Sequence, residues 1–191
     1  MSAANLVSVN VVRRLDDLLR VISVRSLVYM GEQHCPFEEE FDGNDFAGAT
    51  HLVASFDEEP VGVMRLRWFA DFAKVERVAV RAERRGRHAV AALIASASEI
   101  AARKGYRKIL GHIQARLLPF WVRIGGVTVR SDRPRFQFSD RDYVEVIKDL
   151  PPHKDALGWH TEALVLLRPE GAWDEPGVLE RPSRVGQAVR G

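Results

Sequence analysis

The first half of the chain alternates short apolar runs with one amphipathic stretch. Residues 6–12 are a short, valine-rich run, which indicates a strand. Two apolar or alternating runs, 51–56 and 61–68, are joined by an acidic turn that contains Pro60, and this pattern predicts an antiparallel hairpin. Residues 74–80 alternate again and predict a further strand. Between the first strand and the hairpin, helical spacing predicts a helix through Leu15, Leu18, Leu19, Ile22, Leu27 and Val28.

The second half predicts further helices and strands in alternation. Residues 85–104 are rich in alanine and end at Gly105, which predicts a helix with a glycine stop. A short apolar strand is expected at 108–114, a short helix that ends at a pair of glycines at 117–124, and another strand at 127–130. The apolar side of the long helix carries Leu93, Ile94, Ile100 and Ala101.

The end of the chain is harder to interpret by pattern. Residues 143–150 and 162–168 are both candidates for the last strand, and we favour 162–168. Three prolines and four glycines in the last 23 residues predict an extended tail over 169–191. In the front half, the acidic segment 35–48 contains two glycines and is expected to be a loop or a short irregular helix.

Composition limits what kind of protein this is. With 191 residues and 46% hydrophobic content, we expect one domain over 1–168 followed by the tail 169–191. A net charge of +2 is too small for a protein whose main task is to bind nucleic acid through many phosphates. Residues 1–20 match neither a signal peptide nor a membrane span, so we expect a soluble, cytoplasmic protein with no membrane partner.

Cysteine and histidine usage adds two further expectations. The single Cys35 cannot form an internal disulfide and is expected to be a packed thiol rather than a nucleophile. The six histidines show no metal-ligand spacing with that cysteine, so no metal site is predicted. They lie at His34, His51, His88, His112, His153 and His160.

The order of predicted strands and helices, together with four short motifs, resembles the GNAT superfamily of acyl-CoA-dependent N-acyltransferases over roughly residues 5–168. The motifs are Glu76-Arg77-Val78-Ala79-Val80-Arg81, then Arg84-Arg85-Gly86-Arg87, then Gly105-Tyr106, and Phe120-Trp121-Val122-Arg123-Ile124-Gly125-Gly126. The resemblance implies an α/β (α+β) fold with a mixed, mostly antiparallel central sheet and helices on both faces. It implies acetyl-CoA or another acyl-CoA as co-substrate and a small-molecule or peptide amine as acceptor. A homodimer is one possible assembly.

The loop that leads into the alanine-rich helix is the expected cofactor site. The first N–H groups of a helix have no internal partner, and with the helix dipole they form a receptor for a pyrophosphate. Arginine side chains there suit the phosphates of coenzyme A, although they are also typical of a solvated cationic cluster. In the resembled family, the preceding strand pairs with the pantetheine amides. The implied cofactor residues are Val78, Ala79, Val80, Arg84, Arg85, Gly86, Arg87, His88, Ala89 and Val90.

This loop departs from the family pattern at its small positions. The pattern is Gln or Arg, two residues, Gly, one residue, then Gly or Ala, and it places Arg85 first, His88 at the first glycine and Val90 at the last position. Glycine lets a phosphate approach the backbone closely, so these side chains could narrow the pocket. His88 could also donate to a phosphate oxygen, or it could be a solvated helix residue.

Acyl transfer to an amine needs a base for the ammonium proton and an acid for the thiolate that leaves. The resemblance implies Glu76 as the base; the alternative is an ion pair with Arg65, Arg67 or Arg77. The usual tyrosine of the family is replaced, because the corresponding pair here is Phe120-Trp121. Tyr143 is the substitute we select, and a half-buried strand tyrosine is the alternative.

The acidic stretch 38–45 lies where this fold often borders the acceptor. Its carboxylates would favour a cationic amine, unless they are simply a solvated loop. The segment 25–51 is also similar to a GNAT subgroup that resembles autoinducer synthases. Three functions are therefore weighed: an N-acyltransferase, which we favour, a catalytically degenerate domain that binds a partner or effector, and an acyl-homoserine-lactone-synthase-like enzyme.

Overall fold

The computed structural model describes residues 7–139 and 141–181. Contacts divide the chain into two compact units, Met1–Ala156 and Leu157–Gly191, which are described separately below. The division comes before the boundary that composition predicts after residue 168. The first unit contains the sheet and the longer helices.

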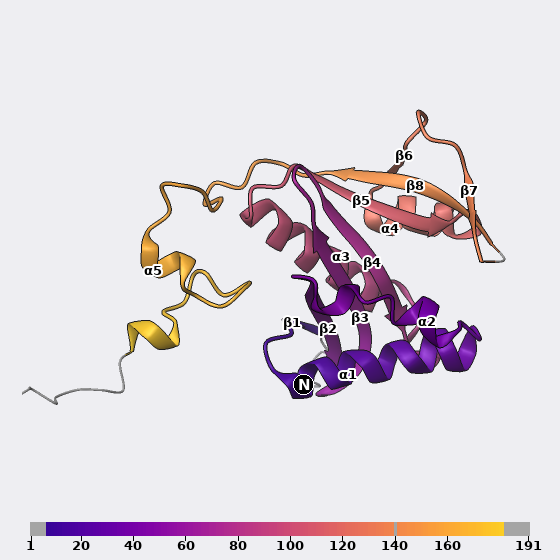
Figure 1. The fold of residues 1–191 in the computed structure, drawn as a ribbon, viewed down its shortest axis with the longest axis horizontal. Coiled ribbons are helices and arrows are strands. Elements are labelled where there is room, and N and C mark those ends of the chain that lie inside the picture. Colours follow the sequence, from indigo (N-terminus) through magenta and orange to yellow (C-terminus); the bar gives the residue numbers. More distant parts are fainter. Residues whose placement is uncertain (1–6, 140, 182–191) are drawn as a thin grey trace, which may run out of the picture. The chain divides into compact units, whose positions relative to one another are not determined.

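A mixed sheet is the centre of the first unit (Figure 1). Its strands run in the order β1-β2-β3-β4-β5-β8-β6, and β7 also pairs with β8. The pairing of β4 with β5 is parallel, whereas every other pairing among the described residues is antiparallel. The strands are β1 (Ser8–Val11), β2 (Thr50–Phe56), β3 (Glu59–Trp68), β4 (Ala73–Val80), β5 (Lys108–Gln114), β6 (Thr128–Val129), β7 (Phe136–Phe138) and β8 (Arg141–Asp149).

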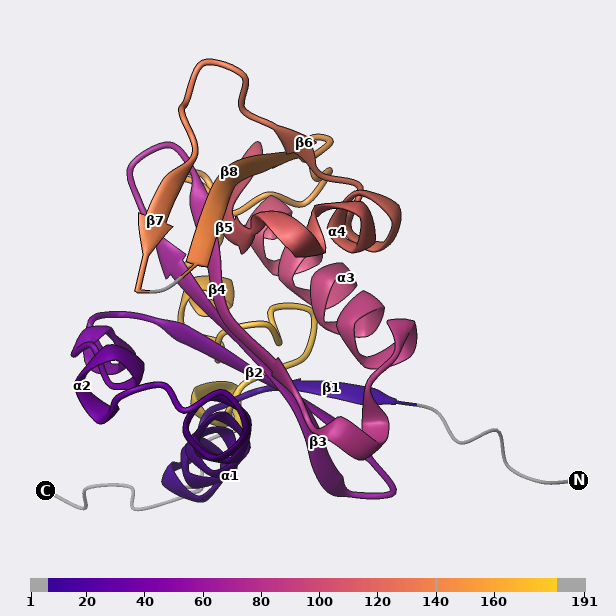
Figure 2. The same ribbon diagram turned by 90° about the vertical axis from the view of Figure 1, so that its right-hand side faces the viewer.

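Helices cover both faces of this sheet, which confirms the predicted fold class. In Figure 2, α1 lies on one side of the strands, and α3 and α4 lie on the other. Valines of α1 pack on β2, β3 and β4, because alternate residues of a strand point to the same face. The helices are α1 (Leu15–Arg25), the π-helical segment η1 (Ser26–Glu32), α2 (Phe37–Glu40), η2 (Asn44–Phe46), η3 (Ala82–Arg84), α3 (Arg87–Arg103), η4 (Ala115–Leu117) and α4 (Leu118–Gly125).

The prediction that residues 162–168 form the last strand is wrong, and the alternative, residues 143–150, corresponds to β8. β8 occupies 141–149 and pairs with every residue of β5, with Val144 and Val146 buried. Residues 162–168 instead contain a helical turn, α5 (Ala163–Leu166). A continuous apolar run fits a strand or a helix equally well, so periodicity alone cannot separate the two.

The second unit is small, and Arg168 links its successive turns by hydrogen bonds. Besides α5 it contains the turn η5 (Val178–Glu180). Arg168 donates two hydrogen bonds to the Glu180 carboxylate, at 2.9 and 2.8 Å, and one to the carbonyl of Trp173. The predicted extended tail therefore contains a folded-back turn as far as residue 181, and residues 182–191 lie outside the described residues.

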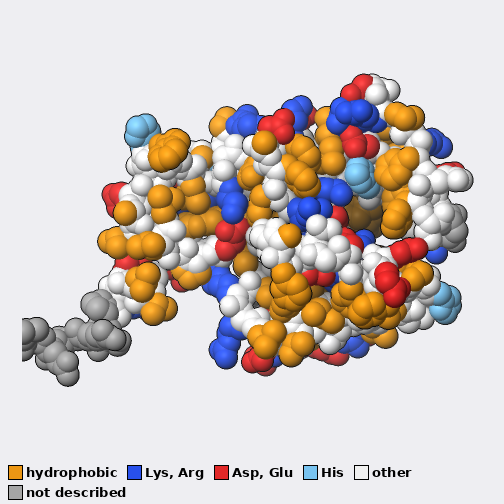
Figure 3. Space-filling view, viewed as in Figure 1, with side chains coloured by type: hydrophobic (Ala, Val, Ile, Leu, Met, Phe, Trp, Pro, Cys, Tyr) orange, Lys and Arg blue, Asp and Glu red, His pale blue; other side chains and the backbone are white. Residues whose placement is uncertain are grey.

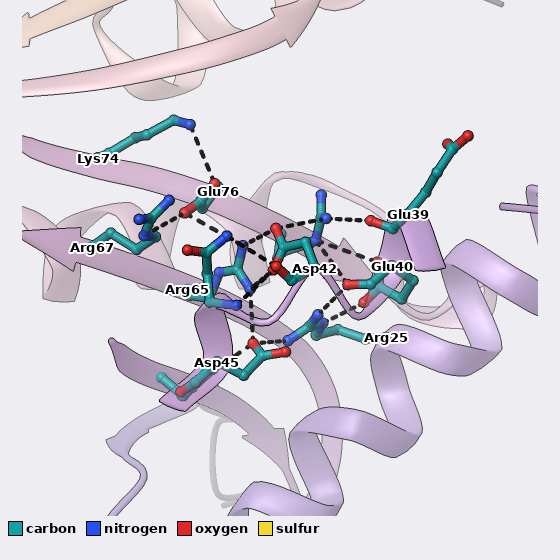
Figure 4. A network of polar contacts seen from close by, with 12 residues as sticks. Arg25, Glu39, Glu40, Asp42, Asp45, Arg65, Arg67, Lys74 and Glu76 are labelled. Atoms are coloured by element: carbon teal, nitrogen blue, oxygen red, sulfur yellow. Dashed lines mark hydrogen bonds and ion pairs between the residues drawn. The ribbon is translucent and has the colours of Figure 1, made fainter. Parts of the chain in front are cut away.

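A cluster of buried charges ties α1 to the segment 37–46 and to β3 (Figure 4). Arg25 donates to the carboxylates of Glu40 and Asp45, and Arg65 donates two bonds to Asp42, at 2.9 and 2.7 Å, and one to Asp45, at 2.9 Å. Arg25, Glu40 and Arg65 are fully shielded from solvent. Charges buried so deeply are tolerated only when each is paired and hydrogen-bonded.

This cluster settles one expectation about the acidic segment. The interpretation as a solvated loop is wrong for Glu40 and Asp45, whose side chains are 1% and 8% exposed. Burial alone would raise the pKa of Asp42, but hydrogen bonds from Arg65 and from the Asn44 backbone outweigh it and hold the pKa well below its usual range. Burial also raises the pKa of Asp45, but hydrogen bonds from Arg25 and Arg65 outweigh this effect and lower the pKa below its usual value.

We expect Asp45→Asn to lower the free energy of unfolding by about 1–3 kcal/mol at pH 7, because Arg25 and Arg65 each lose one charged partner in a buried cluster and keep Glu40 and Asp42, respectively. Urea unfolding measures the loss. The exposed Asp71→Asn is the matched control and should change stability by less than about 0.5 kcal/mol. An equal, small effect of both substitutions would contradict this account of the cluster.

The same carboxylates make stability depend on acid. Their folded pKa values are lowered, so their contribution is complete above the unfolded aspartate value of about 4 and is lost as pH falls through the folded values. Wild type should therefore lose stability steeply below pH 4, and Asp45→Asn should lose less over that interval.

Candidate active site

The two central strands of the sheet separate along their length. β4 and β5 pair only at Ala73 with Ile109, Lys74 with Leu110 and Val75 with Gly111. Beyond these pairs, β5 continues to pair with β8, and β4 continues to pair with β3. Figure 1 shows the two strands diverging from a common point. The edge of β4 that faces β5 is therefore without a strand partner from Glu76 onward, within the described residues.

A bulge in β4 lies at the start of this separation. The register with β3 shifts so that Arg77 and Val78 together lie opposite Met64. Arg77 has a φ of 51°, a left-handed conformation that costs a non-glycine residue about 1–2 kcal/mol. Extra residues of this kind bend a strand and expose its backbone, and they occur often beside active sites.

Side chains on both sides hold the bulge in place. Arg77 donates to the backbone carbonyl of Glu39 and to the Asp42 carboxylate, the latter at 3.0 Å. The Tyr29 hydroxyl donates to the carbonyl of Val78 at 2.7 Å. The strained backbone is thus fastened by the buried charge cluster and by η1.

A cavity of about 190 Å³ lies where β4 and β5 separate and is lined by residues of both strands. Its buried lining is apolar and includes Ala97, Ile109, Ile113 and Val146. Its partly exposed lining includes the polar residues Gln33, Glu76, Arg77, Gln114 and Tyr143. In Figure 3 the opening is a recess to the right of centre, with hydrophobic side chains inside and charged side chains near its edge.

The loop from β4 to α3 has the predicted form. Gly86 precedes α3, whose 17 residues begin at Arg87, and as the N-cap residue Gly86 has no side chain that could cap the helix. Among the described residues, the first backbone N–H groups of α3 therefore have no cap from that position and can receive an anion. Ala89 and Val90 are buried, and Val90 packs in a core with Val80, so its side chain is directed into the protein.

The predicted cofactor residues of β4 and the loop are engaged in different ways. Val78 lines the cavity, whereas Ala79 and Val80 are buried in the cores below α1 and α3. The Arg84 guanidinium lies over the ring of Phe56, and Arg85 forms an ion pair with Glu32. His88 is exposed, and the side chain of Arg87 lies outside the described part of the chain.

The carboxylate of Glu76 faces the cavity among cations. It lies 3.4 Å from Arg65, 3.6 Å from Arg67 and 3.3 Å from Lys74. The ion pairs that we named as the alternative for Glu76 are thus present with two of the three arginines, while Arg77 bonds to Asp42 instead. One buried oxygen of Glu76 has no hydrogen-bond partner among the described residues, so it can accept a hydrogen bond from a donor group that enters the cavity.

Tyr143 reaches the same cavity from β8. Its hydroxyl lies 3.5 Å from the side-chain nitrogen of Gln114, and its ring stacks on Phe136 and meets Phe138 edge-on. The structure therefore brings both predicted proton-transfer residues to one opening from opposite sides. Trp121, which replaces the family tyrosine, lines the cavity as well.

Sequence reasoning missed several polar residues of this cavity, among them Tyr29 and His112. Burial raises the pKa of Tyr29, whose hydroxyl donates to the carbonyl of Val78. His112 of β5 is a hydrogen-bond partner of Glu145 at 2.9 Å and lines the cavity. The π-helical turn that places Tyr29 has no readable signal, because the sequence there fits an ordinary helix.

The described residues contain neither a cluster of metal-ligating side chains nor a membrane-spanning helix. No group of three or more His, Cys, Asp or Glu side chains is arranged to hold a metal ion in the described ranges 7–139 and 141–181. Within the same ranges, no helix has the length and apolar character needed to cross a membrane.

Known proteins resemble this chain in both sequence and fold. The uncharacterized N-acetyltransferase YjcF of Bacillus subtilis (strain 168) is 29% identical over 102 residues, which are 53% of this chain and 72% of YjcF. An acyl-CoA N-acyltransferase from Pseudomonas aeruginosa matches with a TM-score of 0.66 and 22% identity, over 74% of this chain and 99% of that one.

A third match is the CoA-dependent acyl-homoserine lactone synthase BjaI with SAM and isopentyl-CoA, at a TM-score of 0.62 and 16% identity over 76% of this chain and 84% of that chain. At such identities, the likeness to these two solved structures establishes the fold alone. The model of the acetyltransferase (GNAT) family matches residues 18–127, more than half of the chain. The chain therefore belongs to the GNAT acetyltransferase family.

Proposed function

We propose that this protein transfers an acyl group from an acyl-CoA to a primary amine of a small molecule or peptide. The observation that carries the proposal is the unpaired edge of β4, which leads from the cavity directly to the uncapped start of α3. An extended chain of amides can pair with such an edge, and a pyrophosphate suits the free N–H groups beyond it. These are the two halves of a coenzyme A molecule.

The residues present fit this co-substrate despite the altered loop. Backbone groups, not side chains, provide the contacts expected from Val78, Ala79 and Val80, and from Gly86 to Val90. The side chain of Val90 is directed into the core, so it does not stand over the N–H groups. We assign Arg84, Arg85 and Arg87 to the phosphates, for which Arg84 and Arg85 would exchange their present partners Phe56 and Glu32.

The chemistry needs two proton transfers with the protein and one with solvent. Glu76 accepts a proton from the ammonium of the acceptor, so that the neutral nitrogen can attack the thioester carbonyl. As the C–N bond forms and the C–S bond breaks, the nitrogen releases its second proton to solvent, which yields a neutral amide and the thiolate of coenzyme A. Tyr143 then donates its proton to that thiolate and recovers one from solvent.

Two other functions are weighed against this proposal. A degenerate binding module would bind acyl-CoA without releasing thiol in the presence of any amine. The hypothesis of acyl-homoserine-lactone synthesis rests on the segment 25–51. Carboxylates of that segment form ion pairs with Arg25, Arg65 and Arg77. These contacts serve the protein's own stability and favour no particular acceptor, so we do not propose that activity.

Glu76→Gln should reduce turnover by about a hundredfold to ten-thousandfold, because a positioned base contributes that much to the rate. The measurement is release of coenzyme A thiol with a panel of polyamines, amino acids and aminoglycosides from pH 6 to 9. Tyr143→Phe should reduce the rate more mildly, since solvent can partly replace an exposed acid.

Calorimetry with coenzyme A is the control for Glu76→Gln, whose affinity should be unchanged, and the exposed Glu38→Gln should behave as wild type throughout. Normal turnover of Glu76→Gln would show that Glu76 serves only as the ion-pair partner of its neighbours. Wild type that binds acetyl-CoA but releases no thiol with any acceptor would favour the binding module.

The double substitution Arg85→Ala and Arg87→Ala should weaken coenzyme A binding and leave the melting temperature nearly unchanged. The ion pair of Arg85 with Glu32 is largely exposed, and such pairs contribute little to folding. Arg20→Ala, on the exposed side of α1, is the matched control. Unaltered affinity in the double variant would refute the phosphate assignment.

His88→Gly should tighten coenzyme A binding if the imidazole obstructs the loop, and weaken it if the imidazole is a ligand. We expect tighter binding, because His88 lies exposed at the loop rather than packed. Val90→Gly is instructive as a contrast: it removes a buried side chain and should cost stability, by about 2–4 kcal/mol, without improving affinity.

A further inference from the structure

The inner end of the cavity is apolar and lies where a glycine interrupts a row of large side chains. Along β5, Ile109, Gly111 and Ile113 point to the same face, because side chains repeat every second residue. Both isoleucines are buried. A Cβ added at Gly111 would come within 4 Å of a single atom, in Val146, at 3.4 Å. The space over Gly111 is thus open, although it is enclosed by buried neighbours.

The helical wall of the cavity also contains a small residue. Ala97 of α3 lines the cavity, is fully shielded and has the smallest side chain that a helix favours. Ile94 of α3 and Trp121 of α4 complete the wall. A glycine inside a strand weakens the strand, so it is commonly found where a ligand approaches the backbone closely.

Among the described residues, the polar side chains that line the cavity are exposed, partly exposed or already paired. Lys148 lines it, but its ammonium is bound to the carbonyl of Gly125 at the end of α4, at 2.7 Å. The polar lining residues Glu76, Gln114 and Tyr143 are on the partly exposed side. The pantetheine arm carries amides that need partners, and these are available along the β4 edge and not among the buried apolar residues.

The whole cavity is about 190 Å³, and it must hold the thioester and the acceptor nitrogen as well as the acyl chain. For comparison, an apolar cavity of about 150 Å³ is enough to bind benzene, which has six carbons. An acetyl group would place only a single methyl among the buried apolar lining residues. Empty apolar space forfeits packing contacts, so a longer chain that fills it gains them.

We propose that this chamber, formed by Ile94, Ala97, Ile109, Gly111, Ile113 and Trp121, binds the acyl chain of the donor. The preferred co-substrate is then an acyl-CoA with an uncharged chain longer than two carbons, such as butyryl-CoA, rather than acetyl-CoA. This inference rests on the proposed acyl transfer and specifies its donor.

Calorimetry with coenzyme A and with its acetyl, propionyl, butyryl, hexanoyl and succinyl thioesters tests the inference without requiring turnover. Each methylene that enters an apolar site strengthens binding about fourfold, so butyryl-CoA should bind about 15-fold more tightly than acetyl-CoA. The ratio kcat/KM from thiol release should rise in the same order. Succinyl-CoA should bind no better than acetyl-CoA, because its carboxylate would be buried.

Gly111→Val fills the chamber in a strand position that favours branched side chains. We expect it to abolish the preference for butyryl-CoA and to leave the affinity for free coenzyme A unchanged. Gly111→Ala adds one methyl and should show an intermediate preference if the valine variant folds poorly. Leu110→Val, one residue earlier and on the opposite face of β5, is the matched control and should keep the wild-type preference.

Equal affinity for acetyl-CoA and butyryl-CoA, or tighter binding of succinyl-CoA, would overturn the chamber and leave acyl transfer intact. Binding that rises with chain length but no thiol release with any acceptor would support the chamber and defeat the proposed enzyme. Absence of binding by every thioester and by coenzyme A would defeat both.

Discussion

The separation of β4 from β5 is the constraint on which the site depends, and Arg77 is where it is fixed. A non-glycine residue in a left-handed conformation persists only when its surroundings determine it. Here the guanidinium of Arg77 is bound to the backbone and to a carboxylate of the segment 39–42. That segment is in turn held by two fully buried arginines, so the charge cluster and the open strand edge form one structural unit.

This arrangement explains why the cluster is buried despite the cost of removing charges from water. Replacing buried ion pairs by apolar residues is often neutral or favourable for stability, so stability alone does not account for it. Apolar side chains could fill the same volume, but they could not donate to the carbonyl groups of an irregular loop while holding a strained strand. Arg25 and Arg77 each bond to the carboxylate and to the backbone carbonyl of Glu40, and Arg77 is itself the strained residue of β4.

Much of the fold was predictable from the sequence because its elements carry local signals. The hairpin at 50–68 is formed by apolar or alternating runs around an acidic turn, and α3 ends at Arg103, two residues before Gly105, whose φ is 88°, a conformation that favours glycine. The last strand was not predictable, since 141–149 and 162–168 differ in their partners rather than in their pattern. The charge cluster was missed for the same reason: Arg65 is 20 residues from Asp45 in sequence, and only the sheet brings them together.

The site divides along the same line. The proposed cofactor loop and Glu76 could be selected from sequence because they lie in motifs, and Tyr143 was selected only as a substitute for the replaced family tyrosine. Tyr29, by contrast, lies in a π-helical turn and reaches Val78 across 49 residues. Two family features are absent, the loop glycines and the helix tyrosine, and both are side-chain features. The unpaired edge of β4 and the N–H groups of α3 are backbone features, which those substitutions do not remove. A binding site formed mainly by backbone tolerates such changes, so sequence departures in this loop are weak grounds for assigning loss of function.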